Sequence, residues 1–175
     1  AFTNTVGSGS LTINFGTWSA DPTSGGGQTH TANSLDSITV HTTSTTTLTQ
    51  LRDLLNNAAS DSDNDGKQDV LASVIYDGTN YMLMLKSESG ASNEMKVTAT
   101  SNLANTVNNV SYNYNATTSN MNQRVAGTDS AFSVDGISMT RDSNSVSDLF
   151  DGFTLDLFAT SSDTVTLRSS VDLDN

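Results

Sequence analysis

The sequence predicts a mainly β protein of the α+β class, with one or two short helices and two small antiparallel β subdomains. Three observations support this fold class. Apolar and polar residues alternate with the period of a half-buried strand in several stretches, for example Leu11–Phe15 and Phe153–Leu157. Turn dipeptides follow two expected strands, at Asp77-Gly78 and Asp135-Gly136. One segment, Thr47–Ala59, has helical spacing instead.

The first subdomain is expected to span residues 1–103 and to contain the helix at 47–59. Thr47 and Gln50 form the Thr-x-x-Gln pattern of a capping box, in which each side chain bonds the backbone N–H of the other residue. Met82 and Met84 flank Leu83 in the second strand of a hairpin, so both faces of that strand are expected to be covered. Further strands are expected at Ile38–Val40, Tyr81–Leu85 and Met95–Ala99, the last closing the sheet, with a loop at Asp21–Gln28.

The second subdomain is expected to span residues 104–175, after an Asn-rich stretch at 102–123 where the boundary falls. Strands are expected on both sides of the Asp135-Gly136 turn. Asn144 or Ser145 is then expected to cap a short helical turn, with Val146, Leu149 and Phe150 on one face, and Phe153–Leu157 to form a third strand. Whether residues 1–32 stay in the first subdomain or are shared with the second is left open.

Composition excludes several classes of function. The chain carries 19 Asp and Glu against seven Lys and Arg, a net charge of −12, and so repels the phosphates of nucleic acids. It has no Cys for disulfides or thiol chemistry, and no apolar run long enough to insert into a membrane. Because it begins without Met and shows no signal-peptide pattern, we expect it to be a piece of a longer protein.

One loop has the spacing of a calcium site. Asp61, Asp63 and Asp65 alternate before Gly66, and Asp69 stands at the ninth position of the pattern. Alternate carboxylates can converge on a cation when a glycine allows the sharp turn between them. The twelfth position, where a bidentate acid normally completes the shell, is Ala72. The sequence therefore predicts a possible calcium site with an incomplete ligand set, and the alternative is an acidic surface turn.

No catalytic site is expected. His30 and His41 are the only imidazoles, and the chain contains no G-x-S-x-G, phosphate-loop or HExxH motif. Abundant Ser and Asp do not make a catalytic triad, because the nucleophile must lie within hydrogen-bonding reach of an oriented base. Solvated histidines are the simpler interpretation. Trp18, beside a Gly-rich loop, is a candidate partner contact, with local packing as the alternative.

The stretch AFSVDGISMTRDSNSVSDLFDGFTLDL resembles the bacterial flagellar filament-capping protein family, also called hook-associated protein 2. That family has an "A-x-(F/L)-x-(V/L)-D-G" strand, then "R-x-S-N", then "D-x-(I/F)-x-G-(V/F)-T-L-x-L". The matching positions here are Ala131, Phe132, Val134, Asp135, Gly136, Arg141, Ser143, Asn144, Asp148, Gly152, Phe153, Thr154, Leu155 and Leu157.

A second block resembles the flagellin "IN" motif that occurs in flagellins and flagellar caps. It consists of LRDLLNNA, then VLASVIYDG, then YMLMLKSESGASNEMKV. The helix end of that motif usually reads Ile-Asn, whereas this chain has Leu55-Asn56. The chain also inserts Asp61–Asp69 before the strand, which the motif does not need.

Together the two resemblances imply a non-enzymatic, structural head fragment of a flagellar cap. The whole protein would be extracellular at the filament tip, would self-associate into a cap oligomer and would promote flagellin assembly. Adhesion to a host surface or glycan would be a further role. The alternative from another class is a calcium-stabilised extracellular bacterial adhesin module, which the acidic loop fits equally well. A secreted hydrolase is the third hypothesis.

Overall fold

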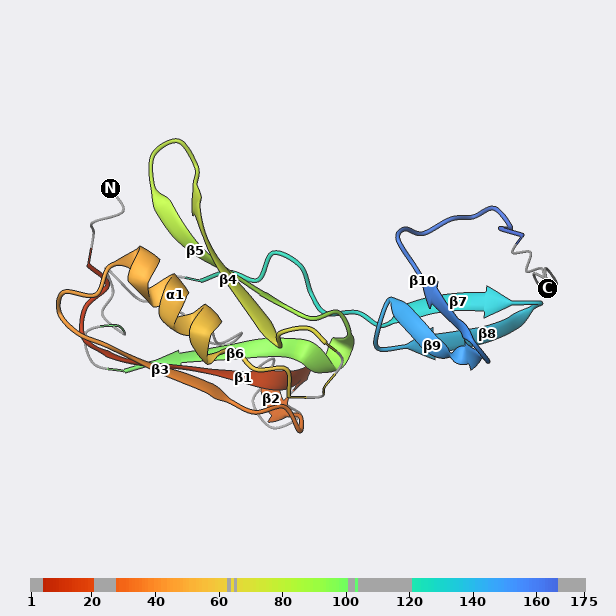
Figure 1. The fold of residues 1–175 in the computed structure, drawn as a ribbon, viewed down its shortest axis with the longest axis horizontal. Coiled ribbons are helices and arrows are strands. Elements are labelled where there is room, and N and C mark those ends of the chain that lie inside the picture. Colours follow the sequence, from red (N-terminus) through yellow and green to blue (C-terminus); the bar gives the residue numbers. More distant parts are fainter. Residues whose placement is uncertain are drawn as a thin grey trace, which may run out of the picture. The chain divides into compact units, whose positions relative to one another are not determined.

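The computed structural model describes residues 5–20, 28–62, 64, 66–100, 103 and 121–166 (Figure 1). Its strands are β1 (Gly9–Ala20), β2 (Gln28–Ala32), β3 (Ile38–Thr42), β4 (Val70–Tyr76), β5 (Tyr81–Ser87), β6 (Glu94–Ala99), β7 (Ser130–Val134), β8 (Ile137–Arg141), β9 (Ser145–Phe150) and β10 (Phe153–Asp156). The helices are α1 (Leu48–Ala58) and the 3-10 turn η1 (Ala91–Asn93). All strand pairs among the described residues are antiparallel, which confirms the predicted fold class. The chain forms two compact units, residues 1–143 and 144–175.

The long strand β1 organises the first unit. Leu11 and Ile13 pair with residues of both β3 and β6, so these two strands lie on opposite edges of β1. Gly16 pairs with both β2 and β6, which places β2 on the same edge as β3. β2 was not expected from the sequence. The strand predicted to close the sheet after the hairpin, β6, instead pairs with β1, an error that arose because adjacency in sequence does not fix pairing.

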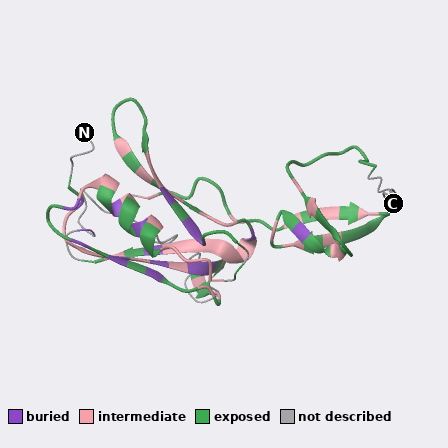
Figure 2. Cartoon of the chain, in the orientation of Figure 1, coloured by how far each residue is buried: buried purple, intermediate pink, exposed green. Residues whose placement is uncertain are grey.

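Helix α1 supplies the second layer of this unit. Its predicted capping box is present: the backbone N–H of Gln50 donates to the Thr47 hydroxyl, and that of Thr47 donates to Gln50 Oε1. Leu51 and Leu55 are fully buried, on the apolar face that the helical spacing predicted. They join a core of alternate residues from the strands: Leu11, Ile13, Phe15, Ile38, Val40, Val70, Ala72 and Val97. Figure 2 shows these buried positions along α1 and the adjoining strands.

The β4–β5 hairpin is fastened to α1 through one amide. Asn56 donates from Nδ2 to the carbonyl oxygen of Ala72, at 2.9 Å, and accepts from the Ala72 backbone N–H at Oδ1, at 2.7 Å. The side chain thus takes the place of a neighbouring strand for a residue that is only 2% exposed. At the other end of the hairpin, the predicted Asp77-Gly78 turn brings Tyr76 opposite Tyr81, with ring centroids 4.6 Å apart.

The prediction of a short helix after Asn144 is wrong. Ser145–Phe150 is strand β9, which pairs with β10 through a turn at Gly152, where φ is 79°. Apolar residues at Val146, Leu149 and Phe150 fit one helical turn, but a single turn gains too few hydrogen bonds to offset its nucleation cost. Pairing with the following strand satisfies more backbone groups. By contrast, the Asp135-Gly136 turn is present between β7 and β8, with φ of 50° and 82° at its two residues.

Several expectations lie outside the described residues. These are the loop at residues 21–27, most of the boundary stretch at 102–123, and the last residues of the second subdomain from 167 onward. No helix in the described ranges is long and apolar enough to cross a membrane.

Candidate functional site

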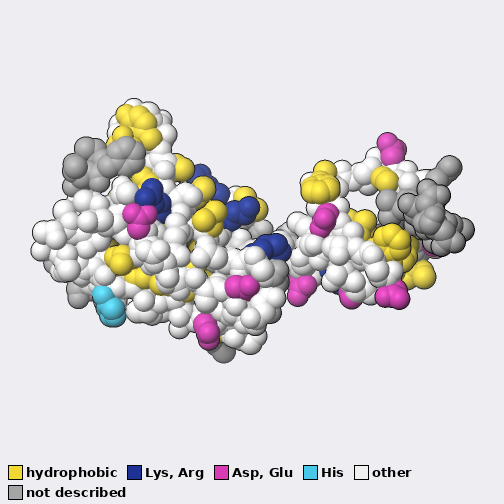
Figure 3. All heavy atoms as spheres, viewed as in Figure 1, with side chains coloured by type: hydrophobic (Ala, Val, Ile, Leu, Met, Phe, Trp, Pro, Cys, Tyr) yellow, Lys and Arg dark blue, Asp and Glu magenta, His cyan; other side chains and the backbone are white. Residues whose placement is uncertain are grey.

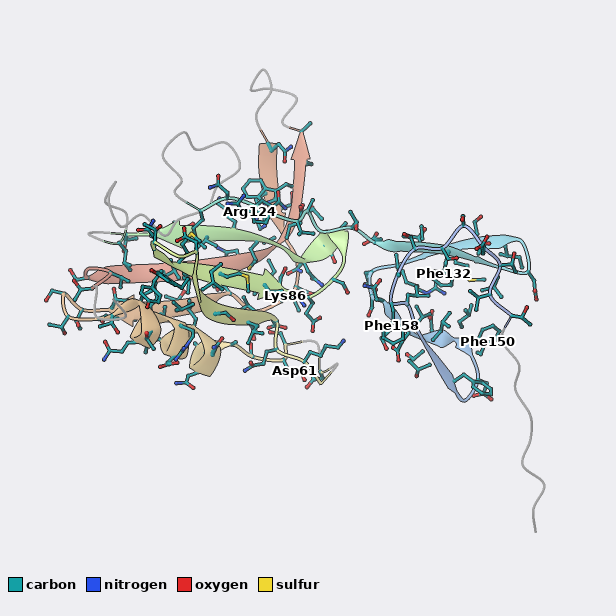
Figure 4. The ribbon with its side chains drawn as sticks, turned by 90° about the horizontal axis from the view of Figure 1, so that it is seen from above. Asp61, Lys86, Arg124, Phe132, Phe150 and Phe158 are labelled. Atoms are coloured by element: carbon teal, nitrogen blue, oxygen red, sulfur yellow. The ribbon has the colours of Figure 1, made fainter. Side chains whose placement is uncertain are left out.

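The predicted calcium loop joins α1 to β4, where Figure 4 labels Asp61. Asp63 and Asp65 lie outside the described residues. Asp61 accepts a hydrogen bond at Oδ2 from the backbone N–H of Gly66, at 2.9 Å. Asn64 and Gly66 have positive φ, 61° and 87°, so the chain makes the sharp turn that the pattern requires.

Asp69 has a structural role in this loop. Its side chain is 1% exposed. One carboxylate oxygen accepts from the Ser62 backbone N–H at 3.2 Å, and the other accepts from the hydroxyls of Ser60 and Ser62. These bonds close the loop against the start of β4. In the described ranges no group of three or more His, Cys, Asp or Glu residues is arranged to hold a metal ion. Calcium binding at Asp61, Asp63, Asp65 and Asp69 stays a prediction.

Trp18 and His30 pack locally on the main sheet. Their rings lie 4.8 Å apart at an angle of 60°. Trp18 Nε1 donates to the backbone carbonyl of Met95, and its backbone N–H donates to Glu94 Oε2. A ring nitrogen of His30 lies 3.2 Å from the carbonyl oxygen of Glu94. These contacts account for both side chains without a partner molecule.

An open groove of about 430 Å³ lies beside α1 and the turn that precedes it. Most of its lining side chains carry hydroxyl, amide or carboxylate groups: His41, Thr43, Thr45, Thr46, Gln50, Asp53, Leu54 and Asn57. The Gln50 amide is already committed to the helix cap, and Asp53 pairs with Arg52. The hydroxyls of Thr43, Thr45 and Thr46 bond within their own turn.

The outer face of the β4–β5 hairpin is the most apolar exposed surface of the first unit. Strand alternation and the pairs Leu71↔Lys86, Ser73↔Met84 and Ile75↔Met82 place these six side chains on one face. We call them the hairpin face. Its apolar members are 39–51% exposed: Leu71, Ile75, Met82 and Met84. Figure 3 shows hydrophobic side chains gathered over this hairpin, with Lys and Arg side chains beside them.

The expectation that both faces of β5 are covered is therefore wrong. The face with Leu83 and Leu85 packs against the core, whereas Met82 and Met84 face outward. Helix α1 covers the core face, because Leu51 and Leu55 share a core with Val70 and Ala72, and the described residues contain no helix that covers the outer face. The sequence did hold a signal for this surface. Both faces of the hairpin are apolar, and a two-stranded sheet has few neighbouring elements that could cover the second one.

Comparison with known proteins connects the chain to one family. The family model described as "Flagellar hook-associated protein 2 C-terminus" matches residues 127–175. No curated protein matches the chain in sequence.

Solved structures match over most of the chain. The flagellar cap protein FliD D2–D3 domains from Serratia marcescens are 28% identical with a TM-score of 0.61, covering 90% of this chain and 74% of that one. FliD (HAP2) from Pseudomonas aeruginosa is 26% identical with a TM-score of 0.56, covering 89% of this chain and 62% of that one. The FliD D2–D3 domains from Escherichia coli share the fold, with a TM-score of 0.68 at 23% identity, covering 93% of this chain and 72% of that one.

The coverage of the solved structures indicates which of their domains the chain resembles. The chain spans 40% of the E. coli structure that contains D1, D2 and D3, but 72% of the one that contains only D2 and D3. The family model and the fold agree, and both agree with the motifs between Ala131 and Leu157. Residues 127–175 therefore match the hook-associated protein 2 family model, and most of the chain is similar in fold to the D2–D3 head domains of flagellar cap proteins.

Proposed function

We propose that this chain is the head of a filament cap that associates with further copies of itself and guides flagellin subunits into the growing filament. The observation that carries the proposal is the joint match of a hook-associated protein 2 family model and of the D2–D3 fold. The family is structural and non-enzymatic, and its members act outside the cell at the filament tip. The contacts with flagellin belong to the proposal.

The surface chemistry of the chain suits this role. A net charge of −12 keeps an extracellular protein soluble and repels anionic polymers. The described polar groups bond each other in structural roles, as Asp69, Asn56 and Glu94 do, and are not arranged around a reaction site. An apolar face on the hairpin offers a protein contact instead.

Adhesion to a host surface or glycan is a separate proposal for the outward side of the cap. It is tested by binding the purified protein to immobilised glycans and to host cells. Failure to bind in both assays would remove adhesion and leave the cap role intact.

The cap role is tested by deleting the gene. Without the cap, exported flagellin should appear in the medium as monomer and filaments should be absent by electron microscopy. Returning the gene on a plasmid should restore filaments and swimming. Normal filaments in the deletion strain, with flagellin retained on the cell, would contradict the proposal. The adhesin alternative predicts that outcome.

A further inference from the structure

The hairpin face has a composition that the rest of the chain lacks. β4 and β5 together contain no Asp or Glu, although the chain has 19 of them. The single charged member of the face is Lys86, one of only seven Lys and Arg. Four neighbouring side chains on the face are large, apolar and exposed: Leu71, Ile75, Met82 and Met84. The face is therefore apolar with a positive edge, on a protein that is strongly negative.

The face is presented on a rigid support. Val70 and Ala72 are buried in the core, and Asn56 bonds both backbone groups of Ala72. Towards the tip, Tyr76 and Tyr81 stack and the Tyr76 hydroxyl donates to the Gly78 carbonyl at 2.6 Å. A preordered surface loses little conformational entropy when a partner binds.

One edge of the hairpin favours a protein partner. The backbone groups of Ala72 bond Asn56 and not β5, so Ala72 belongs to the set of alternate residues whose N–H and C=O point away from β5. Val74 and Tyr76 belong to the same set. Among the described residues the hairpin is a sheet of two strands, so this edge has no strand beside it. A polypeptide can satisfy such backbone groups while covering the adjoining apolar face.

We propose that the hairpin face is a contact between copies of this chain in the cap, with the apolar face and Lys86 of one copy docked on an acidic surface of the next. The inference rests on the proposed function, which requires self-association. Charge complementarity is the reason for choosing a second copy of this chain as the partner. Two copies at −12 each repel one another, and a carboxylate-free face with a cation is where that repulsion is least.

The contact is heterologous, because the face of one copy meets a different surface of the next. Two hairpin faces placed against each other would offer Lys86 no carboxylate from either pair of strands. A head-to-tail contact instead pairs each Lys86 with acidic groups, and repetition of such a contact closes a ring when the rotation allows it.

The first experiment maps the contact in assembled caps. The photoreactive residue p-benzoylphenylalanine is placed at Met84 in the cap protein of a complemented deletion strain, and in a second strain at Thr39. Thr39 is a matched control because it is exposed on a strand and its hydroxyl contacts Thr12 on the main sheet, away from the hairpin. Irradiated filaments should yield a cap–cap adduct from position 84 and none from position 39.

The outcomes separate the inference from the proposed function. A cap–flagellin adduct from position 84 would show a different occupant and overturn the inference. So would the absence of any adduct from position 84 in cells that swim normally. Failure of the unaltered gene to restore filaments would instead defeat the proposed function.

The second experiment tests charge complementarity. Met84→Asp and Met84→Lys introduce charges of opposite sign at the same exposed position, so both should fold equally well. Met84→Asp should abolish the cap oligomer in sedimentation and filament assembly in cells, whereas Met84→Lys should retain most of both. Equal loss in the two variants, or loss confined to Met84→Lys, would contradict docking on an acidic surface. Matched circular dichroism melting curves exclude unfolding as the cause.

Discussion

The first unit and the C-terminal unit are both built from short strands and tight turns, but they bury very different amounts of apolar surface. In the first unit, side chains from β1, β3, β4, β6 and α1 meet in one core, and Phe15 is 1% exposed. In the described part of the C-terminal unit, Val146 is the buried hydrophobic residue, while Phe153 is 58% exposed and Phe158 94%.

The difference lies in the second layer. An alternating sequence makes a strand with an apolar face, but that face is buried only if another element covers it. Helix α1 does this in the first unit, with Leu51 and Leu55 facing the sheet. The strands β9 and β10 have no helix beside them within the described residues of their unit.

Hydrogen exchange should show the largest contrast between the units. Amides of Leu11, Ile13 and Phe15 lie in a central strand and should open only with global unfolding, whereas Val146 and Leu155 should open locally. A difference of about 4 kcal/mol in the free energy of opening corresponds to about a thousandfold difference in exchange rate. NMR or mass spectrometry measures both sets in one sample. Equal protection would mean that the C-terminal unit is stabilised as strongly as the core.

Truncating one phenylalanine in each unit should separate them again. Phe15→Ala removes a fully buried ring and should lower the free energy of unfolding by about 3–5 kcal/mol. Phe158→Ala removes an exposed ring and should change it by less than about 0.5 kcal/mol. Urea unfolding measures both. A loss of similar size in Phe158→Ala would show that the exposed ring is buried in solution.

The acidic loop of the first unit provides a ligand test. If Asp61, Asp63, Asp65 and Asp69 bind calcium, the ion at a hundred times its dissociation constant should add about 2.7 kcal/mol to the free energy of unfolding. Melting in calcium and in chelator measures the effect. Asp63→Asn with Asp65→Asn should abolish it. Identical melting curves for the unaltered protein would remove calcium from this loop and leave Asp69 with its bonds to Ser60 and Ser62.

The link between α1 and the hairpin should depend on a single amide. Asn56→Ala leaves the buried N–H and C=O of Ala72 without their partner and should cost about 1–3 kcal/mol. Asn57→Ala, at the adjacent exposed position, is the matched control and should cost less than about 0.5 kcal/mol. Chemical unfolding compares the two. Equal effects would mean that helix propensity, and not the bond to Ala72, is responsible.

The smallest effect is expected at the hairpin tip, which is exposed like much of the C-terminal unit. The backbone N–H groups of Asn80 and Thr79 donate to Asp77 and lower the pKa of its carboxyl below 3.8. A lowered folded pKa means that these bonds stabilise the turn above pH 3.8 and that the contribution is lost as the pH falls through the folded pKa. An NMR titration should find the Asp77 midpoint below 3.8. In Asp77→Asn the amide resonances of Thr79 and Asn80 should no longer shift as the pH falls, because the titrating carboxyl is absent. A midpoint at or above 3.8 would contradict the turn geometry.

The sequence by itself determined the helix cap and the tight turns, which depend on a few adjacent residues. The capping box of Thr47 and Gln50 placed α1, and the turns at Asp77-Gly78 and Asp135-Gly136 placed two hairpins, because a cap or a positive φ depends on a few adjacent residues. The same kind of short-range pattern between Ala131 and Leu157 indicated the family. The apolar spacing of Val146, Leu149 and Phe150 failed because it fits one helical turn as well as it fits a strand.

Only the tertiary structure decided which strands distant in sequence pair and which faces are covered. The pairing of β1 with β2, β3 and β6 joins residues far apart in sequence. Backbone hydrogen bonds form whatever side chains the two strands carry, so the side chains of one strand do not identify its partner. Likewise, Leu83 and Met84 are neighbours of similar hydrophobicity, yet Leu83 packs on the core and Met84 is exposed. The position of α1 makes that distinction, since a strand has two faces and one helix covers only one of them.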